Sequence, residues 1–254
     1  MVEPEISIVI PSYNEMKNLS RGVLDEVNNY LLTQPYTWEV ILSDDGSTDG
    51  TLDLLSEFCQ THPGFKLLRN QHAGKAPTVK AGMLTATGEW RLFTDFDQST
   101  PLSELEKLLP FCKLGYQVIF GSREIFGSLR DKEPFYRHLM GRGFNFLVQL
   151  LAVPGVQDTQ CGFKLFSAAA TTTLFNRLVI YGRSEHRQDA FTGAFDVELL
   201  YLARRFGFSH QEVPIKWRHF ASDRVSPIRD SLRMLWDILR IRFASFTGKY
   251  AVKI

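Results

Sequence analysis

The sequence predicts an α/β fold in which a mostly parallel β-sheet is flanked by helices. Two observations lead to this prediction. Short apolar segments rich in β-branched and aromatic residues alternate with longer segments of helical pattern. Their spacing along the chain suits right-handed crossovers between parallel neighbours. At 254 residues, the chain is long enough for one large domain of this kind.

Five strands are expected in the first half of the chain, at residues 6–10, 38–43, 65–68, 90–94 and 116–120. Each is a short and mainly apolar run, and Pro11, which lacks a backbone donor, ends the first of them. Helices are expected between the strands, at residues 18–32, 49–58, 76–85 and 103–114. Ser47 or Asp49 is the expected N-cap of the second helix.

The second half of the chain is less regular. A long apolar helix is expected at residues 134–152, a short strand at 161–166 and a helix at 195–206. Pro214 predicts that a strand at 211–218 lies at an edge of the sheet, because proline leaves one ladder hydrogen bond unmade. A last helix, at 226–246, has apolar residues at steps of three and four, namely Ile228, Leu232, Leu235, Leu239, Phe243 and Phe246.

The composition limits the class of protein. With 44% hydrophobic and 22% charged residues, the chain has enough apolar side chains for a packed core, and global disorder is disfavoured. The formal net charge of +1 argues against a general nucleic-acid binder. Three widely separated cysteines favour neither zinc nor a disulfide framework, so we expect a reducing compartment. We see neither a signal peptide nor a continuous apolar run of membrane-spanning length.

The charge is unevenly distributed along the chain. Residues 216–254 have a net charge of +6, which leaves −5 for the rest. In this tail Arg229, Arg233 and Arg240 flank the apolar stripe of the last helix. Such a helix either lies on an anionic bilayer or packs on the core, and the sequence leaves both open. We therefore expect a catalytic domain over residues 1–220 and an amphipathic, membrane-interfacial extension over residues 221–254.

Acidic residues follow three of the expected strands. Asp44 and Asp45 come after the second strand, and Asp95 and Asp97 after the fourth, while Glu15 follows the first. Sites in parallel sheets form at the carboxyl ends of the strands, where these residues would meet. Carboxylates gathered in one cleft need a compensating cation or ligand, and a DxD pair suits a hard cation such as Mg²⁺ or Mn²⁺. In isolation such a pair is more often a solvated loop.

The pair is not isolated. PSYNE at 11–15, DDGSTDGT at 44–51, the Gly74-Lys75 step and TDFDQSTP at 94–101 occur in this order on successive strand ends. This combination resembles the inverting family 2 glycosyltransferases of GT-A fold. Within that family, the GSR segment at 121–123 and the DTQCGFKLF segment at 158–166 look closest to the polyprenyl-phosphate hexosyltransferases, of dolichyl-phosphate glucose or mannose synthase type.

The resemblance implies a role for each of these segments. A nucleotide would be bound by Pro11, Tyr13, Glu15, Asp44, Asp45, Ser47, Lys75 and Asp95. Asp95, Asp97 and Gln98 would bind Mg²⁺ or Mn²⁺ beside the donor diphosphate. Here the chain departs from the common pattern, because Phe96 separates the aspartates and Ser99 stands where mannose synthases have a glutamine. Whether Gln98 or Ser99 reaches the metal is therefore open.

The implied acceptor is a lipid phosphate. Arg123, Arg137 and Arg142 would bind it, since a guanidinium offers a planar fork to phosphate oxygens. Asp158 and Gln160 would contact the sugar. Asp97, Arg123 and Asp196 are the expected catalytic residues of a single displacement with inversion. A phosphate acceptor is already anionic, so it needs orientation more than deprotonation.

The expected function is thus transfer of a hexose, from UDP-glucose by preference or else GDP-mannose, to a polyprenyl phosphate at the cytoplasmic face of a membrane. One alternative is a family 2 enzyme acting on a glycan hydroxyl, which needs a carboxylate base such as Asp158 or Asp196. Another is a non-catalytic nucleotide- or membrane-binding member. A NAD-binding protein is disfavoured, because no GxGxxG follows the first strand. Homo-oligomerisation is neither required nor excluded.

Overall fold

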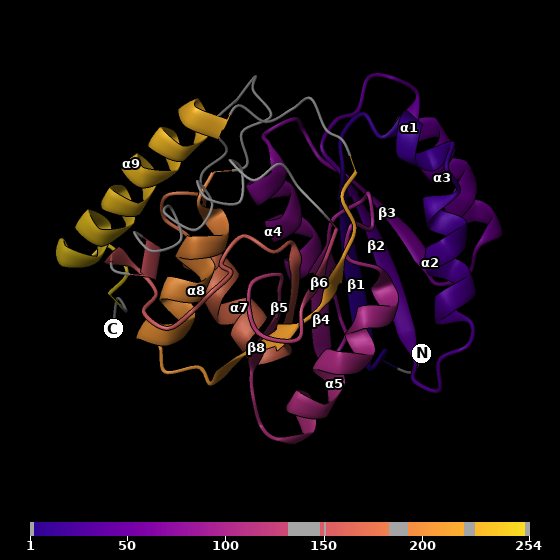
Figure 1. The fold of residues 1–254 in the computed structure, drawn as a ribbon. Helices are drawn as coiled ribbons and strands as arrows, with labels where there is room; N and C mark the ends of the chain where they lie inside the picture. The colour runs from indigo at the N-terminus through magenta and orange to yellow at the C-terminus, as the bar shows by residue number, and fades with distance from the viewer. Residues whose placement is uncertain (1–2, 132–147, 150, 183–192, 221–226, 252–254) are drawn as a thin grey trace.

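The computed structural model describes residues 3–131, 148–149, 151–182, 193–220 and 227–251. A seven-stranded sheet in the order β3-β2-β1-β4-β7-β5-β8 forms the centre of the molecule (Figure 1). Its strands are β1 (Ile6–Ser12), β2 (Trp38–Asp44), β3 (Phe65–Arg69), β4 (Trp90–Thr94), β5 (Val118–Ser122), β7 (Phe163–Ser167) and β8 (His210–Pro214). All neighbouring pairs are parallel except the two that β7 makes, with β4 and with β5. The predicted mostly parallel α/β fold is confirmed.

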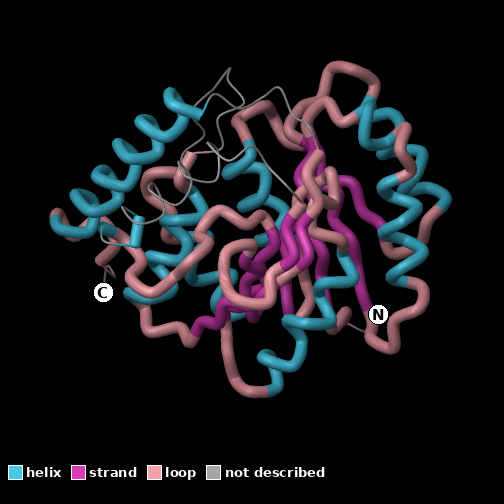
Figure 2. Tube along the Cα trace, viewed as in Figure 1, coloured by secondary structure: helices cyan, strands magenta, loops and turns pink. Residues whose placement is uncertain are grey.

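Helices cover both faces of the sheet (Figure 2). They are α1 (Met16–Leu19), α2 (Val23–Leu31), α3 (Thr51–Thr61), α4 (Lys75–Thr85), α5 (Leu105–Lys113), α7 (Ala168–Asn176), α8 (Phe195–Arg205) and α9 (Pro227–Phe246). Side chains alternate between the two faces along each strand. Val9 on β1 therefore packs in one core with α4, α7 and α8, whereas its neighbours Ile8 and Ile10 pack in a second core with α2, α3 and α5.

The structure differs from the expected elements at two turns. The helix expected at 18–32 is broken into α1 and α2, because Gly22 has φ of 78°, a left-handed conformation that ends the first helix. The strand expected at 211–218 is broken after Pro214 into β8, which does lie at the sheet edge, and β9 (Lys216–Trp217). β9 pairs with β6 (Leu129–Arg130) in a small second sheet that the sequence did not predict.

One predicted element falls largely outside the described residues. It is the apolar helix expected at 134–152, of which residues 148, 149 and 151 are described and helical. α7 was not predicted, although it follows directly on the expected strand at 161–166, which the structure shows as β7. Ser167 caps α7, since its side chain accepts a hydrogen bond from the N–H of Ala170.

The last helix has two apolar faces. Ile238, Ile241 and Ala244 are buried in the core that includes α8. The opposite face carries five exposed apolar side chains, namely Leu232 (63% exposed), Trp236 (65%), Leu239 (44%), Phe243 (64%) and Phe246 (91%). The expected apolar stripe thus lies mainly on the exposed face. The helix packs on the core through a different set of apolar residues on its other side. No helix of the described residues has the length and apolar composition required to cross a bilayer.

Buried polar contacts attach α9 and the chain after it to α8 and its preceding loop. The Tyr181 hydroxyl donates to Asp237, which is 3% exposed. The Tyr250 hydroxyl donates to Glu198 Oε1 at 2.6 Å. Glu198 also accepts the backbone N–H groups of residues 179–181, so one fully buried carboxylate holds two separate segments. A buried carboxylate with this many donors is well compensated for its lost hydration.

We predict that Tyr250→Phe lowers the free energy of unfolding by about 1–2 kcal/mol, because it removes one hydrogen bond to a buried charge. Urea denaturation followed by circular dichroism measures this change. Tyr116→Phe is the matched control, since the Tyr116 hydroxyl has no hydrogen-bond partner in the described part of the chain. Equal destabilisation by the two variants would show that the contact with Glu198 contributes nothing specific.

Candidate active site

The carboxyl ends of β1, β2 and β4 lie side by side, as the sequence predicted. β1 is paired with β2 on one side and with β4 on the other. The pairing places Ser12 beside Asp44, so the segments that follow these strands leave the sheet at the same edge. The Asp44-Asp45 and Asp95-to-Asp97 segments thereby follow the two strands that flank β1, at the same edge of the sheet.

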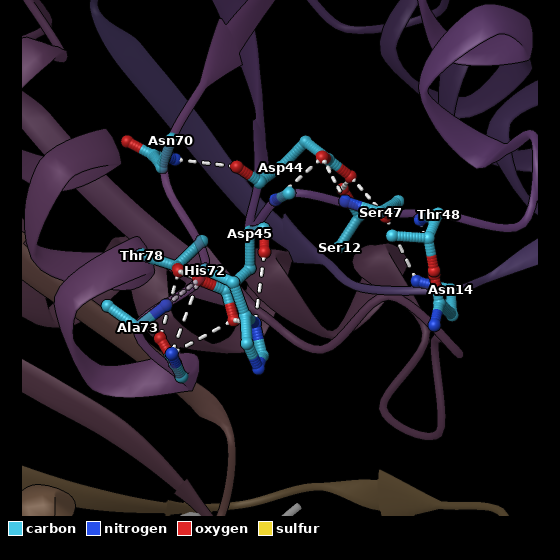
Figure 3. A network of polar contacts seen from close by, with 12 residues as sticks. Ser12, Asn14, Asp44, Asp45, Ser47, Thr48, Asn70, His72, Ala73 and Thr78 are labelled. Atoms are coloured by element: carbon cyan, nitrogen blue, oxygen red, sulfur yellow. Dashed lines mark hydrogen bonds and ion pairs between the residues drawn. The ribbon is translucent and has the colours of Figure 1, made fainter. Parts of the chain in front are cut away.

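Asp44 is a structural anchor of the turn that follows β2. Its buried carboxylate accepts hydrogen bonds from the hydroxyls of Ser12 (3.0 Å) and Ser47 (2.6 Å), and from the N–H groups of Gly46 and Ser47. Asn14 joins the same network by donating its N–H to Ser47 Oγ (Figure 3). Asp44 and Ser47 thus give this turn its shape, and hold the segment after β1 next to it.

Asp45 anchors a different loop, the one that leads into α4. Its carboxylate accepts the N–H groups of Ala73 and Gly74 at 2.9 Å and the hydroxyl of Thr78 at 2.8 Å (Figure 3). His72 completes this set, with Nδ1 2.9 Å from Asp45 Oδ2. The position of Lys75, the first residue of α4, therefore depends on the Asp45 carboxylate.

Tyr13, one of the predicted nucleotide-binding residues, stacks on an aromatic side chain of the protein itself. Its ring lies 4.3 Å from the ring of His72, at an interplanar angle of 16°. His72 is a residue that the sequence analysis missed, and no local pattern distinguishes it. The other two residues of the PSYNE motif that were predicted to bind the nucleotide, Pro11 and Glu15, are half-buried. Pro11 lies within β1, and Glu15 accepts a hydrogen bond from the Asn18 amide.

The Asp95-to-Gln98 segment carries the candidate metal ligands. Asp95 Oδ1 lies 2.5 Å from the ammonium of Lys75. Burial and the charge of Asp95 raise the pKa of Asp97, whose Oδ1 accepts the N–H of Ser99. Gln98 has φ of 50°, a left-handed conformation that is uncommon for residues other than glycine. Such strain is found mainly where function requires it.

This segment fits a divalent cation by one direct observation. Gln98 Oε1 is buried and has no hydrogen-bond partner among the described residues, while its Nε2 donates to the Asp95 carbonyl. A buried acceptor without a donor requires an explanation. Hard cations prefer amide and carboxylate oxygens of this kind. Since the described residues hold no metal-binding group of three or more His, Cys, Asp or Glu side chains, further ligands must come from elsewhere, such as donor phosphates.

Arg123 is fixed by a buried carboxylate. Its Nε and Nη2 donate to the two oxygens of Asp158, at 2.7 and 2.9 Å, and its N–H donates to Asp158 as well. Asp158 is in turn oriented by Glu212 on β8, which accepts the N–H groups of residues 157 and 158. Two of the three guanidinium nitrogens of Arg123, Nε and Nη2, thus donate hydrogen bonds within the protein. Glu212 was not identified from the sequence, although an acidic residue in a strand pattern is a signal.

The other predicted catalytic carboxylate is also paired. Asp196, at the start of α8, lies 2.5 Å from the ammonium of Lys164, which is fully buried. Lys164 lies between Phe163 and Leu165 on β7, and a lysine inside an apolar strand is itself a pattern that indicates a buried partner.

The remaining sugar and acceptor residues are placed as follows. Gln160 donates its N–H to Asp158, and its buried Nε2 has no hydrogen-bond partner in the described residues. A buried amide donor without a partner in the protein is available to a hydroxyl group of a ligand. Arg137 and Arg142 lie outside the described residues, so their expected role in binding the acceptor phosphate remains a prediction.

The sequence comparisons decide the family. The family model described as "Glycosyl transferase family 2" matches residues 7–175. This chain belongs to glycosyltransferase family 2. The resemblance expected from the motifs is confirmed, and the predicted enzyme class of a glycosyltransferase with it.

Individual relatives show which kind of family member this glycosyltransferase is similar to. It is 32% identical to the dolichyl-phosphate beta-glucosyltransferase of Dictyostelium discoideum, covering 98% of this chain and 77% of the relative. The human dolichyl-phosphate beta-glucosyltransferase is 33% identical, covering 98% and 78%. The Saccharomyces cerevisiae enzyme of the same name is 31% identical, covering 96% and 76%. These relatives belong to the dolichyl-phosphate hexosyltransferases that the motifs indicated.

Solved structures confirm the fold of this glycosyltransferase. Mannosyl-3-phosphoglycerate synthase of Rubrobacter xylanophilus has a TM-score of 0.64 at 16% identity, covering 97% of this chain and 76% of that one. Glucosyl-3-phosphoglycerate synthase of Mycobacterium tuberculosis, solved with Mn²⁺ and UDP, has a TM-score of 0.61 at 18% identity, covering 96% and 80%. At this level of identity, the likeness establishes the GT-A fold, not the substrate.

We predict that the Arg123–Asp158 pair makes the free energy of unfolding depend on pH in the acid range. Burial alone would raise the pKa of Asp158, but the Arg123 guanidinium and N–H donors lower it to about 2 in the folded protein. The ionised carboxylate therefore stabilises the fold above the unfolded-state pKa of about 4, and this contribution disappears as the pH falls through about 2. The difference in unfolding free energy between wild type and Asp158→Asn should narrow by about 2 kcal/mol between about pH 5 and pH 2.

Urea denaturation at a series of pH values measures this difference. The pKa of Glu39 is also lowered to about 2, by Lys66 and hydroxyl donors against the effect of burial, but this contribution is common to both proteins and cancels. Parallel stability curves for wild type and Asp158→Asn would contradict the assignment of the acid dependence to Asp158.

Proposed function

We propose that this glycosyltransferase transfers a hexose from a nucleotide sugar to a polyprenyl phosphate of dolichyl type. The preferred donor is UDP-glucose, which supplies glucose, and the next is GDP-mannose, which supplies mannose. The observation that carries the proposal is the site itself. Asp95, Asp97 and Gln98 follow β4 directly, Lys75 contacts Asp95, and the buried Oε1 of Gln98 has no hydrogen-bond partner among the described residues. The similarity to dolichyl-phosphate beta-glucosyltransferases over nearly the whole chain supports both the sugar and the class of acceptor.

On the donor side, Asp95, Asp97 and Gln98 would hold Mg²⁺ or Mn²⁺. When bound there, such an ion supplies positive charge to the departing nucleoside diphosphate. Lys75 is placed to contribute a second positive charge on the diphosphate. Tyr13 and Glu15 would border the nucleobase and ribose, with the turn held by Asp44 and the loop held by Asp45 forming the walls of the pocket. In this proposal Asp44, Asp45 and Ser47 act mainly by positioning.

On the acceptor side, Arg123 is the residue that would bind the lipid phosphate, together with Arg137 and Arg142. Asp158 fixes the guanidinium plane through Nε and Nη2, so that Nη1, which has no hydrogen-bond partner in the described residues, is available to a phosphate oxygen. Gln160 would donate to a sugar hydroxyl from its unpaired Nε2. A phosphate that is held in this way attacks the anomeric carbon from the side opposite the diphosphate, which inverts the configuration.

The pairing of Asp196 with Lys164 supports a phosphate rather than a hydroxyl as acceptor. A hydroxyl acceptor requires a general base with an accessible, unpaired carboxylate. Asp196 and Asp158 are both buried and both paired with a cation, so neither is an accessible, unpaired carboxylate. An acceptor phosphate already has anionic oxygens at neutral pH, which makes such a base unnecessary. We assign Asp196 a positioning role beside the cleft.

Transfer to a lipid phosphate is tested with purified protein, UDP-glucose or GDP-mannose, Mg²⁺ and a short polyprenyl phosphate. We expect a glycosylated lipid and release of the nucleoside diphosphate, and Asp97→Ala should lower this rate by at least about 100-fold. Asp53→Ala, which removes an exposed carboxylate on α3, is the control and should leave the rate unchanged.

Other outcomes would contradict the proposal. Activity on a glycan hydroxyl without any lipid phosphate would favour the second type of family 2 enzyme. Absence of both nucleotide and metal binding would indicate a non-catalytic member. A large loss of stability in Asp97→Ala would mean that Asp97 serves the fold rather than the reaction, so the melting temperature is measured in parallel.

We also propose that the exposed face of α9 binds the cytoplasmic surface of the membrane that contains the lipid acceptor. Leucine, tryptophan and phenylalanine side chains on an exposed stripe are typical of interfacial helices. The exposed cations Arg242 and Lys249 lie on or just after this helix, and the tail as a whole has a net charge of +6. Basic residues beside an apolar stripe strengthen attachment to anionic lipids.

We predict that the double variant Leu232→Glu/Phe243→Glu loses binding to anionic vesicles by about tenfold or more, because it places two charges in the apolar stripe. Flotation with phosphatidylserine-containing vesicles measures the bound fraction. The matched control is Leu114→Glu/Phe126→Glu, which changes the same residue types at exposed positions elsewhere on the surface. Wild-type protein that stays with the soluble fraction, or equal loss in both double variants, would contradict the membrane-binding role of α9.

A further inference from the structure

The ammonium of Lys75 contacts one of the carboxylates that would bind a cation. Nζ lies 2.5 Å from Asp95 Oδ1, and the Lys75 side chain is 23% exposed. Burial opposes the charged form, but the charges of Asp95, Asp196 and Asp97 outweigh it and raise the pKa of Lys75. In the structure, Lys75 is therefore the counter-ion of Asp95, a candidate metal ligand.

The backbone below Lys75 fixes where its side chain begins. Gly74 has φ of 95°, which a residue with a side chain rarely adopts, and its N–H donates to Asp45. Thr78, one turn further along α4, donates its hydroxyl to the same carboxylate. The first turn of α4 is thus attached at two points, and Lys75 reaches Asp95 from an anchored helix start.

The Asp95 carboxylate also packs closely against Gly162. A Cβ atom at Gly162 would lie 2.1 Å from Asp95 Oδ2 and 2.5 Å from its carboxyl carbon. The Asp95 carboxylate therefore fills the space that a side chain at position 162 would take, next to the start of β7. One oxygen of Asp95 contacts the Lys75 ammonium, and the other lies against the Gly162 backbone.

We propose that Lys75 is an exchangeable counter-ion: it neutralises Asp95 in the metal-free enzyme and releases it when a divalent cation and the nucleotide diphosphate bind together. This inference rests on the proposed metal- and nucleotide-dependent function. An ammonium and a divalent cation repel each other and compete for the same carboxylate oxygen. Lys75 gives up Asp95 at low cost only when diphosphate oxygens offer it a new partner.

The exchange predicts a thermodynamic coupling between cation and nucleotide. A cation that binds alone must displace the ammonium of Lys75 and leave it without an equivalent partner. A cation that arrives with a nucleoside diphosphate does not, because Lys75 transfers to the phosphates. By linkage, each ligand should strengthen the binding of the other, and Lys75 should be a main source of this effect.

The experiment measures Mn²⁺ binding by electron paramagnetic resonance of the free ion, with and without UDP, and with GDP in parallel. Lys75→Met should bind Mn²⁺ alone about tenfold more tightly than wild type, because the competing ammonium is gone. The enhancement of Mn²⁺ affinity by the nucleotide should shrink by a similar factor. Lys75→Arg, which keeps the charge, should behave more like wild type, and Lys80→Met on the same helix is the control for loss of a lysine.

The outcomes separate this inference from the proposed function. Unchanged or weaker binding of Mn²⁺ alone by Lys75→Met, in protein with a native circular dichroism spectrum, would overturn the exchange while leaving the glycosyltransferase function intact. Tighter binding in Lys80→Met as well would show a general charge effect and would also overturn it. Wild-type protein that binds no Mn²⁺ even with UDP or GDP would reject the metal-dependent function itself, and the inference with it.

Discussion

The hydrogen bonds of the Asp45 carboxylate are the interaction on which the rest of the site depends. Asp45 follows β2, but its carboxylate oxygens accept hydrogen bonds from the loop before α4, about thirty positions later in the chain. This contact determines where Lys75 begins and where His72 stacks on Tyr13. A parallel sheet makes such contacts possible, because it brings the carboxyl ends of sequence-distant strands to one edge.

Other buried carboxylates hold loops in the same way. Asp44 holds the turn after β2, Glu212 holds the segment that carries Asp158, and Glu198 holds both the loop before α8 and the chain after α9. In each case a buried carboxylate accepts several N–H or hydroxyl donors. These contacts offset the cost of removing the charge from water, and they make loops without regular structure rigid enough to position ligands.

The two parts of the proposed function follow from this architecture. One strand edge gathers the candidate nucleotide- and cation-binding residues, whereas α9 presents an apolar stripe to solvent while its opposite face is packed against the core. An enzyme that joins a water-soluble donor to a lipid-borne acceptor needs both features. The pairing of Asp158 with Arg123 and of Asp196 with Lys164 leaves an arginine, rather than a carboxylate base, as the group suited to the acceptor.

From sequence alone, most of the strands and helices, the mostly parallel sheet, the family and the strand ends that carry the candidate site could be predicted. Strand periodicity and short motifs are local properties of the chain, so Asp95 and Asp97 were identified without a structure. The break of one expected helix at Gly22 was missed because the backbone conformation of a glycine is set by its surroundings.

Which of the candidate carboxylates hold loops was decided by tertiary structure. Asp44, Asp45 and Asp158 look like ligand residues in the sequence, yet their donors come from hydroxyls, N–H groups and a guanidinium that only folding brings near them. The last helix gives the same lesson: its apolar pattern is visible in the sequence, but Leu232 and Phe243 are exposed and Ile238 is buried because of where α8 lies. Local pattern determines the kind of element, whereas the partner of each side chain depends on contacts between residues far apart in the chain.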